Sequence, residues 1–286
     1  SISSTIWAID EDANGDLWFV TQNEGLGKFD RNLGTIDYFI ENLKSNLWDL
    51  IIDDNGYFWI ASTSGLLIYE HQNGKFNLIR TLFKNQVVES LYFDGKYVWM
   101  NLNNGKLTSI PSSMIGEAES ISELEALSTE HQITQSDTVV VPIFTDSEQR
   151  LWVSSPDKIL VFDPVAGEVV RVIEDPSNSS FRAMNVYYWR NFYWVTTFYD
   201  GVIKVNAHSL EIEDRQQVVQ DAGVTFSAQG RDSSVWYTNR LGITRVDLFT
   251  LESKENISKE ALGYNEFSEK AALLTSDEAL VFAGSK

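Results

Sequence analysis

The densest group of residues with metal-binding chemistry is the acidic segment 10–16, which reads Asp-Glu-Asp-Ala-Asn-Gly-Asp. Its carboxylates and amide follow the spacing that begins a calcium loop, in which side-chain oxygens are the ligands. A calcium loop also needs a bidentate Glu at its twelfth position, which here is Thr21, and the ninth position is Trp18. Asn14-Gly15 is a dipeptide typical of a tight hairpin turn. The segment therefore predicts an acidic hairpin turn, and we expect no metal site.

The other residues with catalytic chemistry form no recognisable constellation. His71, His131 and His208 lie far apart, and none has the spacing of a metal ligand. No Gly-x-Ser-x-Gly elbow is present, and Gly25-Leu26-Gly27 lacks the later glycine and the helix of a phosphate-binding loop. The chain has no cysteine, which excludes a disulfide framework, a thiolate metal site and a cysteine nucleophile. We therefore expect no cofactor and no catalytic residues, and predict that the chain is not an enzyme.

Polar and aromatic side chains are instead concentrated in short segments between apolar runs. Amides together with an exposed aromatic pair suit a polar, uncharged small molecule such as an oligosaccharide. The alternative is that these are turn residues, which are favoured for their backbone geometry. The candidate ligand-binding residues are Gln22, Asn23, Glu24, Lys44, Asn46, Asn85, Asn101, Asn103, Arg182, Phe198, Tyr199, Asp200, Asn239, Arg240, Asn265 and Glu266.

The negative net charge of the chain disfavours some classes of binding partner. The 286 residues carry a net charge of −19, which disfavours nucleic acid and anionic membrane surfaces because both attract a positive field. No apolar stretch approaches the length of a membrane span, and the N-terminal residues have no features of a signal peptide. We expect any membrane attachment to come through flanking segments outside this chain.

The segments that carry these residues belong to an internal repeat of about forty residues. Its anchor is a short apolar run around a tryptophan, such as Leu-Trp-Phe-Val-Thr at 17–21. A tight turn and another apolar run precede each anchor, and a glycine and a third apolar run follow most of them. The anchor tryptophans are Trp18, Trp59, Trp99, Trp152, Trp194 and Trp236, and a seventh copy has Val281 in that place.

Each repeat therefore contains four predicted strands: strand, tight turn, tryptophan strand, glycine loop, strand and a weaker fourth strand. Four-stranded antiparallel units with this period are typical of propeller blades. We predict an all-β, antiparallel β-propeller with seven blades, the last incomplete in this chain. The whole of 1–286 is then a single propeller domain, with blades near 1–41, 42–82, 83–134, 135–177, 178–219 and 220–260 and a partial blade at 261–286.

Several features of the repeat have structural interpretations. The anchor tryptophans should fill the space between adjacent blades, since aromatic rings bury a large apolar area. The glycines should supply positive φ at the loop before the third strand. Trp7 and Trp48 precede their anchors by the same interval, and either wall an axial channel or pack between blades. The extra residues at 111–137 form either a short amphipathic helix, with Ile121, Leu124 and Leu127 on one face, or an acidic loop.

The repeat resembles a known signature at two places. Residues 14–26 read Asn-Gly-Asp-Leu-Trp-Phe-Val-Thr and then Gly-Leu, and residues 55–66 repeat this pattern. Both are similar to the two-component regulator propeller repeat. The last copy resembles the closing repeat that this family carries before an immunoglobulin-like domain.

This resemblance implies a function. Propellers of that family form the periplasmic sensor of membrane-bound hybrid two-component or diguanylate cyclase proteins, and several are thought to sense oligosaccharides. For this chain, the resemblance implies a non-catalytic, extracytoplasmic ligand-sensing module. It also implies a small-molecule ligand and a homodimer or tandem propeller contact. Two alternatives remain. One is a lyase or hydrolase acting in an axial pocket, since a lyase that cleaves streptogramin antibiotics shares this architecture. The other is a protein-interaction scaffold.

Overall fold

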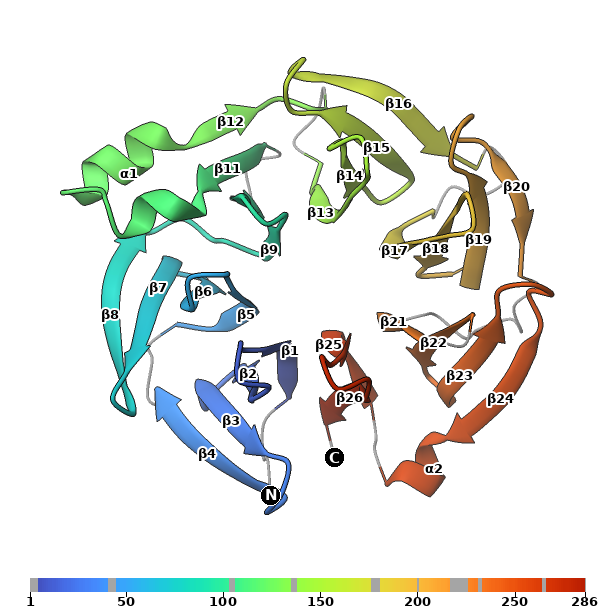
Figure 1. Cartoon of the computed structure of the whole chain (residues 1–286), viewed down its shortest axis with the longest axis horizontal. Coiled ribbons are helices and arrows are strands. Elements are labelled where there is room, and N and C mark those ends of the chain that lie inside the picture. The colour runs from blue at the N-terminus through green and yellow to red at the C-terminus, as the bar shows by residue number, and fades with distance from the viewer. Residues whose placement is uncertain are drawn as a thin grey trace. The chain divides into compact units, whose positions relative to one another are not determined.

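The computed structural model describes residues 5–40, 45–102, 106–134, 138–175, 181–199, 201–216, 226–230, 233–263 and 266–285. The chain divides into two compact units, residues 1–142 and 143–286. Almost every element in both units is a β-strand (Figure 1).

The first unit contains three antiparallel sheets, each built from four strands that are consecutive in the chain. A short 3-10 helix, η1 (Ser112–Ile115), and the helix α1 (Ile121–Leu127) separate the last two strands of the third sheet. The strands are β1 (Ile6–Glu11), β2 (Leu17–Thr21), β3 (Leu26–Asp30), β4 (Thr35–Ile40), β5 (Leu47–Ile52), β6 (Tyr57–Ser62), β7 (Gly65–Gln72), β8 (Lys75–Leu82), β9 (Ser90–Phe93), β10 (Tyr97–Asn101), β11 (Leu107–Pro111) and β12 (Thr129–His131).

The second unit repeats this plan with three further four-stranded sheets and one sheet of two strands. The helix α2 (Lys259–Leu262) precedes the two-stranded sheet. The strands are β13 (Val141–Thr145), β14 (Leu151–Ser154), β15 (Lys158–Asp163), β16 (Glu168–Glu174), β17 (Ala183–Trp189), β18 (Phe192–Thr197), β19 (Gly201–Asn206), β20 (Ile212–Arg215), β21 (Phe226–Gly230), β22 (Ser234–Asn239), β23 (Gly242–Asp247), β24 (Ser253–Ser258), β25 (Glu266–Leu274) and β26 (Leu280–Ser285).

The prediction of four-stranded antiparallel blades is confirmed, but the prediction of seven blades is wrong. The described residues form six four-stranded blades. The seventh copy of the repeat forms only the pair β25–β26, because the described residues after α2 supply no third or fourth strand.

The repeat is most apolar at the second strand of each blade, and the position of this strand explains why. It pairs with a strand on each edge and packs on both faces, so every residue of β2 and nearly every residue of β6 and β18 is buried. A strand covered on both faces reads as a continuous apolar run and not as an alternating one. The first strand is less buried, as in β1, and the fourth strand is the most exposed, as in β4 and β16.

The anchor tryptophans pack between blades, as predicted. Trp18 is fully buried and makes edge-on contacts with Phe58 and Phe76 of the second blade, with ring centroids 5.1 Å apart in both cases. Trp152 contacts Tyr193 of the following blade at 4.5 Å. Burying each ring contributes roughly 1.5–3 kcal/mol or more to the stability of the fold.

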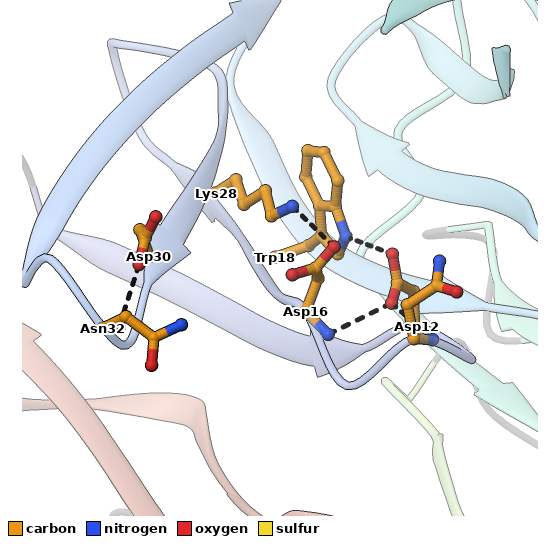
Figure 2. Close-up of polar contacts among 7 residues, drawn as sticks. Asp12, Asp16, Trp18, Lys28, Asp30 and Asn32 are labelled. Carbon is orange, nitrogen blue, oxygen red and sulfur yellow. Dashed lines mark hydrogen bonds and ion pairs between the residues drawn. The ribbon is translucent and has the colours of Figure 1, made fainter. Parts of the chain in front are cut away.

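Four of these tryptophans also donate their indole N–H to an aspartate of the preceding turn. The other carboxylate oxygen of each aspartate accepts two backbone N–H groups of the same turn, as Figure 2 shows in part for Asp12. The turn, the second strand and the packing between blades are therefore linked through one carboxylate. The pairs are Trp18 with Asp12 at 2.9 Å, Trp59 with Asp53 at 2.9 Å, Trp99 with Asp94 at 2.6 Å, and Trp152 with Asp146 at 3.2 Å.

The fifth anchor departs from this arrangement, and the sixth differs in its burial. Trp194 donates its indole N–H to the main-chain carbonyl oxygen of Trp189 at 3.2 Å, with no aspartate involved. Trp236 is only partly buried, in contrast to the earlier anchors. The turn before Trp194 is thus held without the carboxylate that the first four anchors use.

Two further predictions of the repeat are confirmed. Gly65 and Gly242 have φ values of 128° and 142°, and an added Cβ would lie 2.6 Å and 1.9 Å from the carbonyl oxygens of Leu82 and Ile257. Only glycine fits such positions without strain. Trp7 and Trp48 meet edge-on at 5.3 Å, and each packs against an apolar cluster that joins two blades of the first unit. Of the two interpretations given for Trp7 and Trp48, this contact is the one in which they pack between blades.

The segment 111–137 contains a helix, α1, which was one of the two structures predicted for it. The Ser120 side chain caps α1 by accepting the Glu123 N–H at 3.1 Å, and Leu124 is fully buried. Ile121 and Leu127 are exposed, so only one of the three apolar residues reaches the core. α1 packs against β8, and its Glu125 accepts the N–H of Phe83 at 2.8 Å.

Two aspartates of the first strands join neighbouring blades of the first unit. The Ile52 N–H in β5 donates to Asp10 of β1, and the Leu91 N–H in β9 donates to Asp49 of β5, both at 2.7 Å. The same forty-two-residue offset separates donor and acceptor in each case. These bonds fix the first strand of one blade against that of the next.

We expect Asp53→Ala to lower the free energy of unfolding by about 3 kcal/mol or more, because the carboxylate accepts three hydrogen bonds and a charged hydrogen bond contributes about 1.5–3 kcal/mol. Urea denaturation measures this change. Asp54→Ala is the control, since Asp54 is exposed in the same turn and its loss should cost less than about 0.5 kcal/mol. Equal effects of the two substitutions would contradict the structural role of Asp53.

A second prediction concerns how the free energy of unfolding depends on pH. Desolvation raises the pKa of Asp10 to about 7, and the charges of Asp49 and Glu11 add to this, although hydrogen bonds from the Ile52 and Glu11 N–H groups oppose it. The folded chain therefore holds a proton that the unfolded chain, with its usual pKa of 3.8, releases at lower pH. The contribution of Asp10 to the free energy of unfolding should therefore fall as the pH rises from about 4 to about 7.

Urea denaturation of the wild type and of Asp10→Asn across this pH range checks the expectation. The asparagine cannot ionise, so the part of the slope that comes from Asp10 should disappear. Asp54→Asn is the control, and it should leave the slope unchanged. A slope that Asp10→Asn does not alter would show that the carboxyl of Asp10 ionises normally in the folded chain.

Candidate functional site

The predicted segment Gln22–Glu24 forms the loop between β2 and β3. Thr21 holds the loop, since its hydroxyl oxygen accepts the N–H groups of Glu24 and Gly25 at 2.9 and 3.0 Å. The carboxylate of Glu24 accepts the hydroxyl of Tyr38 in β4 at 2.5 Å. Desolvation, then the hydrogen bond to Glu24, raises the pKa of Tyr38. Glu24 is therefore anchored to its own blade, whereas Asn23 is exposed.

Three loops of the first unit meet around the β6–β7 connection. The Ser45 and Thr63 hydroxyls lie 3.1 Å apart, and the Thr63 N–H donates to the carbonyl oxygen of Asn46 at 3.1 Å. On the other side, the Asn85 N–H donates to the carbonyl oxygen of Ser64 at 3.1 Å. The structure thus brings the segments of Asn46 and Asn85 to one connection, and both residues are exposed.

Two predicted residues are buried instead. Asn101, at the end of β10, is fully buried. Asn239 is also buried, and its side-chain oxygen accepts the N–H groups of Leu241 and Gly242 at 2.8 and 3.1 Å. Its amide N–H donates to the Thr244 hydroxyl at 3.1 Å. The side chain of Asn239 stabilises the loop before β23, which is the turn-residue alternative.

The second unit brings three predicted residues together. The loop that enters β17 carries Arg182, and the loop after β18 carries Phe198 and Tyr199. The N–H of Phe198 donates to the carbonyl oxygen of Arg182 at 2.8 Å, and the guanidinium lies 5.7 Å from the Phe198 ring centre. The rings of Phe198 and Tyr199 meet edge-on at 4.6 Å, and Tyr199 is 57% exposed.

The other predicted residues are more scattered or are not described. Arg240 is exposed at the turn between β22 and β23, next to the exposed Leu241. Lys44, Asn103, Asp200 and Asn265 lie outside the described residues, as does the side chain of Glu266.

The acidic segment 10–16 is a hairpin turn. Both carboxylate oxygens of Asp12 accept N–H donors, and Asp16 forms an ion pair with Lys28 at 2.5 Å (Figure 2). The Lys28 ammonium also lies 5.4 Å from the centre of the Trp18 ring. Among the described residues, no group of three or more His, Asp or Glu side chains is placed to hold a metal ion. The carboxylate of Asp12 is used to shape the turn.

The three histidines lie away from the candidate loops. His71, in β7, stacks on Phe76 with ring centres 4.5 Å apart. His131, in β12, lies 3.4 Å from the Ser109 hydroxyl, and desolvation lowers its pKa. His208 is exposed at the turn between β19 and β20. They belong to third and fourth strands and their connections, and not to the loops that carry the predicted site.

One exposed cluster was not identified from the sequence. The Arg190 guanidinium lies 4.8 Å from the ring centres of both Trp189 and Phe249, which meet edge-on at 4.7 Å. Arg190 and Asn191 both have positive φ at the β17–β18 turn, where the first three repeats have an Asn-Gly or Asp-Gly pair. That departure from the usual turn residues is the signal that could have drawn attention to this turn.

No family model matches the chain, and no curated protein sequence is similar to it. Among the described residues, no helix has the length and apolar character needed to cross a membrane.

Solved structures of similar fold are known. The extracellular domain of a hybrid two-component system from B. thetaiotaomicron matches 98% of this chain with a TM-score of 0.75 and 12% identity. The chain spans only 37% of that protein's domain. A streptogramin B lyase matches 99% of this chain and 92% of its own length, with a TM-score of 0.76 and 15% identity. A catalytically inactive virginiamycin B lyase from Staphylococcus aureus with quinupristin has a TM-score of 0.76 and 14% identity. At these identities the likeness establishes the fold, an antiparallel β-propeller.

We expect Tyr38→Phe to loosen the β2–β3 loop, because Glu24 loses the hydrogen bond that ties it to β4. The amide hydrogens of Glu24 and Gly25 should exchange faster, and the free energy of unfolding should fall by about 1–2 kcal/mol. Hydrogen exchange read by mass spectrometry measures the first change. Tyr188→Phe is the matched control, since its hydroxyl bonds only the exposed Asn191 at 3.1 Å. Unchanged exchange in Tyr38→Phe would show that Thr21 alone holds the loop.

Proposed function

We propose that this chain is a non-catalytic, ligand-sensing β-propeller of an extracytoplasmic signalling protein. The observation that supports this most is the match of 98% of the chain to the extracellular domain of a hybrid two-component system. The chain spans little more than a third of that extracellular domain. In this proposal the output of the signalling protein resides in other segments. The proposal places this propeller in the periplasm, as part of the sensor.

The ligand in this proposal is a polar, uncharged small molecule such as an oligosaccharide. The cluster of Arg182, Phe198 and Tyr199 supports it, since an exposed ring offers a flat apolar face beside a guanidinium that donates hydrogen bonds. A sugar ring presents the same combination, with C–H groups on its face and hydroxyls on its edge. The exposed Asn46 and Asn85 offer a second set of amides in the first unit.

The loops that carry these residues belong to more than one blade. In this proposal a bound ligand transmits its signal by acting on several of these loops together. In the first unit, hydrogen bonds join the β6–β7 loop to the segments before β5 and β9. A ligand that favours one arrangement of these loops shifts the population toward it, by as much as its affinities for the two arrangements differ. A homodimer or tandem propeller contact that responds to this shift would relay it to the output.

A lyase is the second candidate, because streptogramin-type lyases match the chain over 92% of their own length. Such an enzyme needs a general base or acid within reach of its substrate. The histidines of this chain lie on third and fourth strands or their turns, away from the candidate loops. This arrangement supports the sensor over the lyase.

A thermal-shift titration with neutral oligosaccharides of defined composition tests the proposal. A binding sugar should raise the melting temperature in a saturable way, since a ligand at about 100 times its Kd stabilises the fold by about 2.7 kcal/mol. Tyr199→Ala should abolish the shift, because the exposed ring is lost while the fold is kept. Tyr188→Ala is the matched control, since Tyr188 is a similarly exposed tyrosine of the same blade outside the candidate loops.

Two results would contradict the proposal. One is the absence of a saturable shift across neutral sugars of different linkage and size. The other is turnover of a streptogramin antibiotic by the purified chain, which would support the lyase.

A further inference from the structure

The sequence contains four Asn-Gly pairs, a dipeptide in which the asparagine side chain can lose its amide. Glycine has no Cβ, so its main-chain nitrogen can approach the side-chain carbonyl carbon of the preceding asparagine closely. Three of the pairs lie within the described residues, each in a turn between two strands. They are Asn14-Gly15, Asn55-Gly56 and Asn73-Gly74, and the fourth pair, Asn104-Gly105, lies outside the described residues.

In the first two of these turns the glycine nitrogen is engaged in a hydrogen bond. The Gly15 N–H donates to the main-chain carbonyl oxygen of Asp12 at 2.9 Å. The Gly56 N–H donates to that of Asp53 at 2.8 Å. The carboxylate of each aspartate also accepts the N–H of the asparagine in its turn, at 2.9 and 3.0 Å. The main chain of both pairs is therefore fixed by the aspartate that begins the turn.

The turn between β7 and β8 is built differently. It consists of Asn73 and Gly74 alone, and the flanking residues Gln72 and Lys75 already form the first pair of the hairpin. Asn73 and Gly74 have φ values of 52° and 73°, as the tightest hairpin turns require. Within the described residues, the Gly74 N–H donates no hydrogen bond and the Asn73 side chain forms none. Neither reacting group of this pair is held by the turn.

Exposure to water does not separate the three pairs, because all three asparagines are exposed. The difference lies in the glycine nitrogen, which attacks the amide carbon only after it has lost its proton. An N–H that donates to a carbonyl oxygen keeps its proton and points away from the asparagine side chain. The hydrogen bonds of Gly15 and Gly56 must therefore open before reaction, and this opening costs free energy that is not required at Gly74.

We propose that Asn73 is a site of spontaneous deamidation in the folded chain, and that the turns of Asn14 and Asn55 are protected from it. The Gly74 nitrogen gives its proton to water and forms a bond to Cγ of Asn73. The C–N bond of the side-chain amide breaks, and the amide nitrogen takes a proton from water and leaves as ammonia. The product is a five-membered succinimide ring that includes atoms of both residues.

Water then opens the ring at one of its two carbonyl carbons. Opening at Cγ leaves an ordinary aspartate. Opening at the main-chain carbon leaves isoaspartate, in which the chain runs through Cβ and Cγ of the former side chain and is longer by a methylene group. Both products carry a carboxylate where the asparagine was neutral, so the chain becomes more negative in either case.

The longer main chain of isoaspartate has a structural consequence, because this turn lies beside a cluster of rings. The length of a hairpin turn fixes the register of its strands, so the extra methylene group displaces the nearby pair of His71 with Phe76. These two rings stack at 4.5 Å, and both meet Trp18 of the first blade edge-on. Isoaspartate formation should therefore loosen the contact between the first two blades, whereas aspartate formation should leave it intact.

Incubation of the folded chain in mildly alkaline buffer, followed by peptide mapping with mass spectrometry, tests the proposal. Asn73 should lose its amide about fivefold faster or more than Asn14 and Asn55, which is the effect of one hydrogen bond of ordinary strength. The same incubation in concentrated urea is the matched control. The three pairs should then react at similar rates, because each has the same dipeptide and none keeps its turn.

Hydrogen exchange checks the consequence of the longer main chain. The amides of β7 and β8 should exchange faster in the isoaspartate form, separated from the aged chain, than in Asn73→Asp. This variant has the new charge on an ordinary main chain, and aspartate tolerates the positive φ of the turn. The proposal is overturned if Asn14 or Asn55 reacts as fast as Asn73 in the folded chain, or if the sites differ equally in urea. Equal exchange in the two forms would contradict the displacement of the strand pair.

Discussion

Four of the blades depend on the hydrogen bond between the anchor tryptophan and the aspartate of the turn before it. One carboxylate oxygen closes the turn by accepting two backbone N–H groups, and the other fixes the indole ring. The ring in turn fills the space against the next blade, as Trp18 does against Phe58. A local turn and a contact between sheets are therefore set by one side chain. An unpaired indole N–H in such a core would cost about 1–3 kcal/mol, so the carboxylate also removes a penalty.

Because the strands are held in this way, the connecting loops can vary without loss of the fold. The β2–β3 loop uses Glu24 and Tyr38 for its own support, while the β18–β19 loop presents Tyr199 to solvent. Loops on a rigid scaffold are where binding residues concentrate. The structure thus separates residues that stabilise a loop, such as Asn239, from residues that a ligand can reach.

Much of the fold could be predicted from the sequence, because the repeat shows directly in the tryptophans and turns. The burial of Trp18 and Trp152 and the positive φ of Gly65 and Gly242 follow from local pattern. The pattern also predicted that the last copy is incomplete, but it counts tryptophan-type strands and not whole blades, and the two strands that the last copy forms in the described residues do not make a seventh blade.

The candidate site was less predictable, for two physical reasons. Whether an amide at a loop is exposed, like Asn85, or buried, like Asn101, depends on tertiary packing that the repeat pattern does not encode. Contacts between blades likewise join side chains forty residues apart, as Arg171 with Glu211 and Asp175 with Arg215. Each of these residues looks like an ordinary charged surface residue when its own blade is considered alone.

The fifth blade shows how a repeat is built without an aspartate bonded to its anchor tryptophan. There the indole N–H of Trp194 donates to a main-chain carbonyl oxygen, which every amino acid supplies, so this hydrogen bond does not require a particular side chain in the turn. That turn now carries Trp189 and Arg190, with Phe249 beside them. The fifth blade therefore holds its tryptophan without help from a turn side chain, and the side chains of that turn are available to form an exposed cluster on the surface.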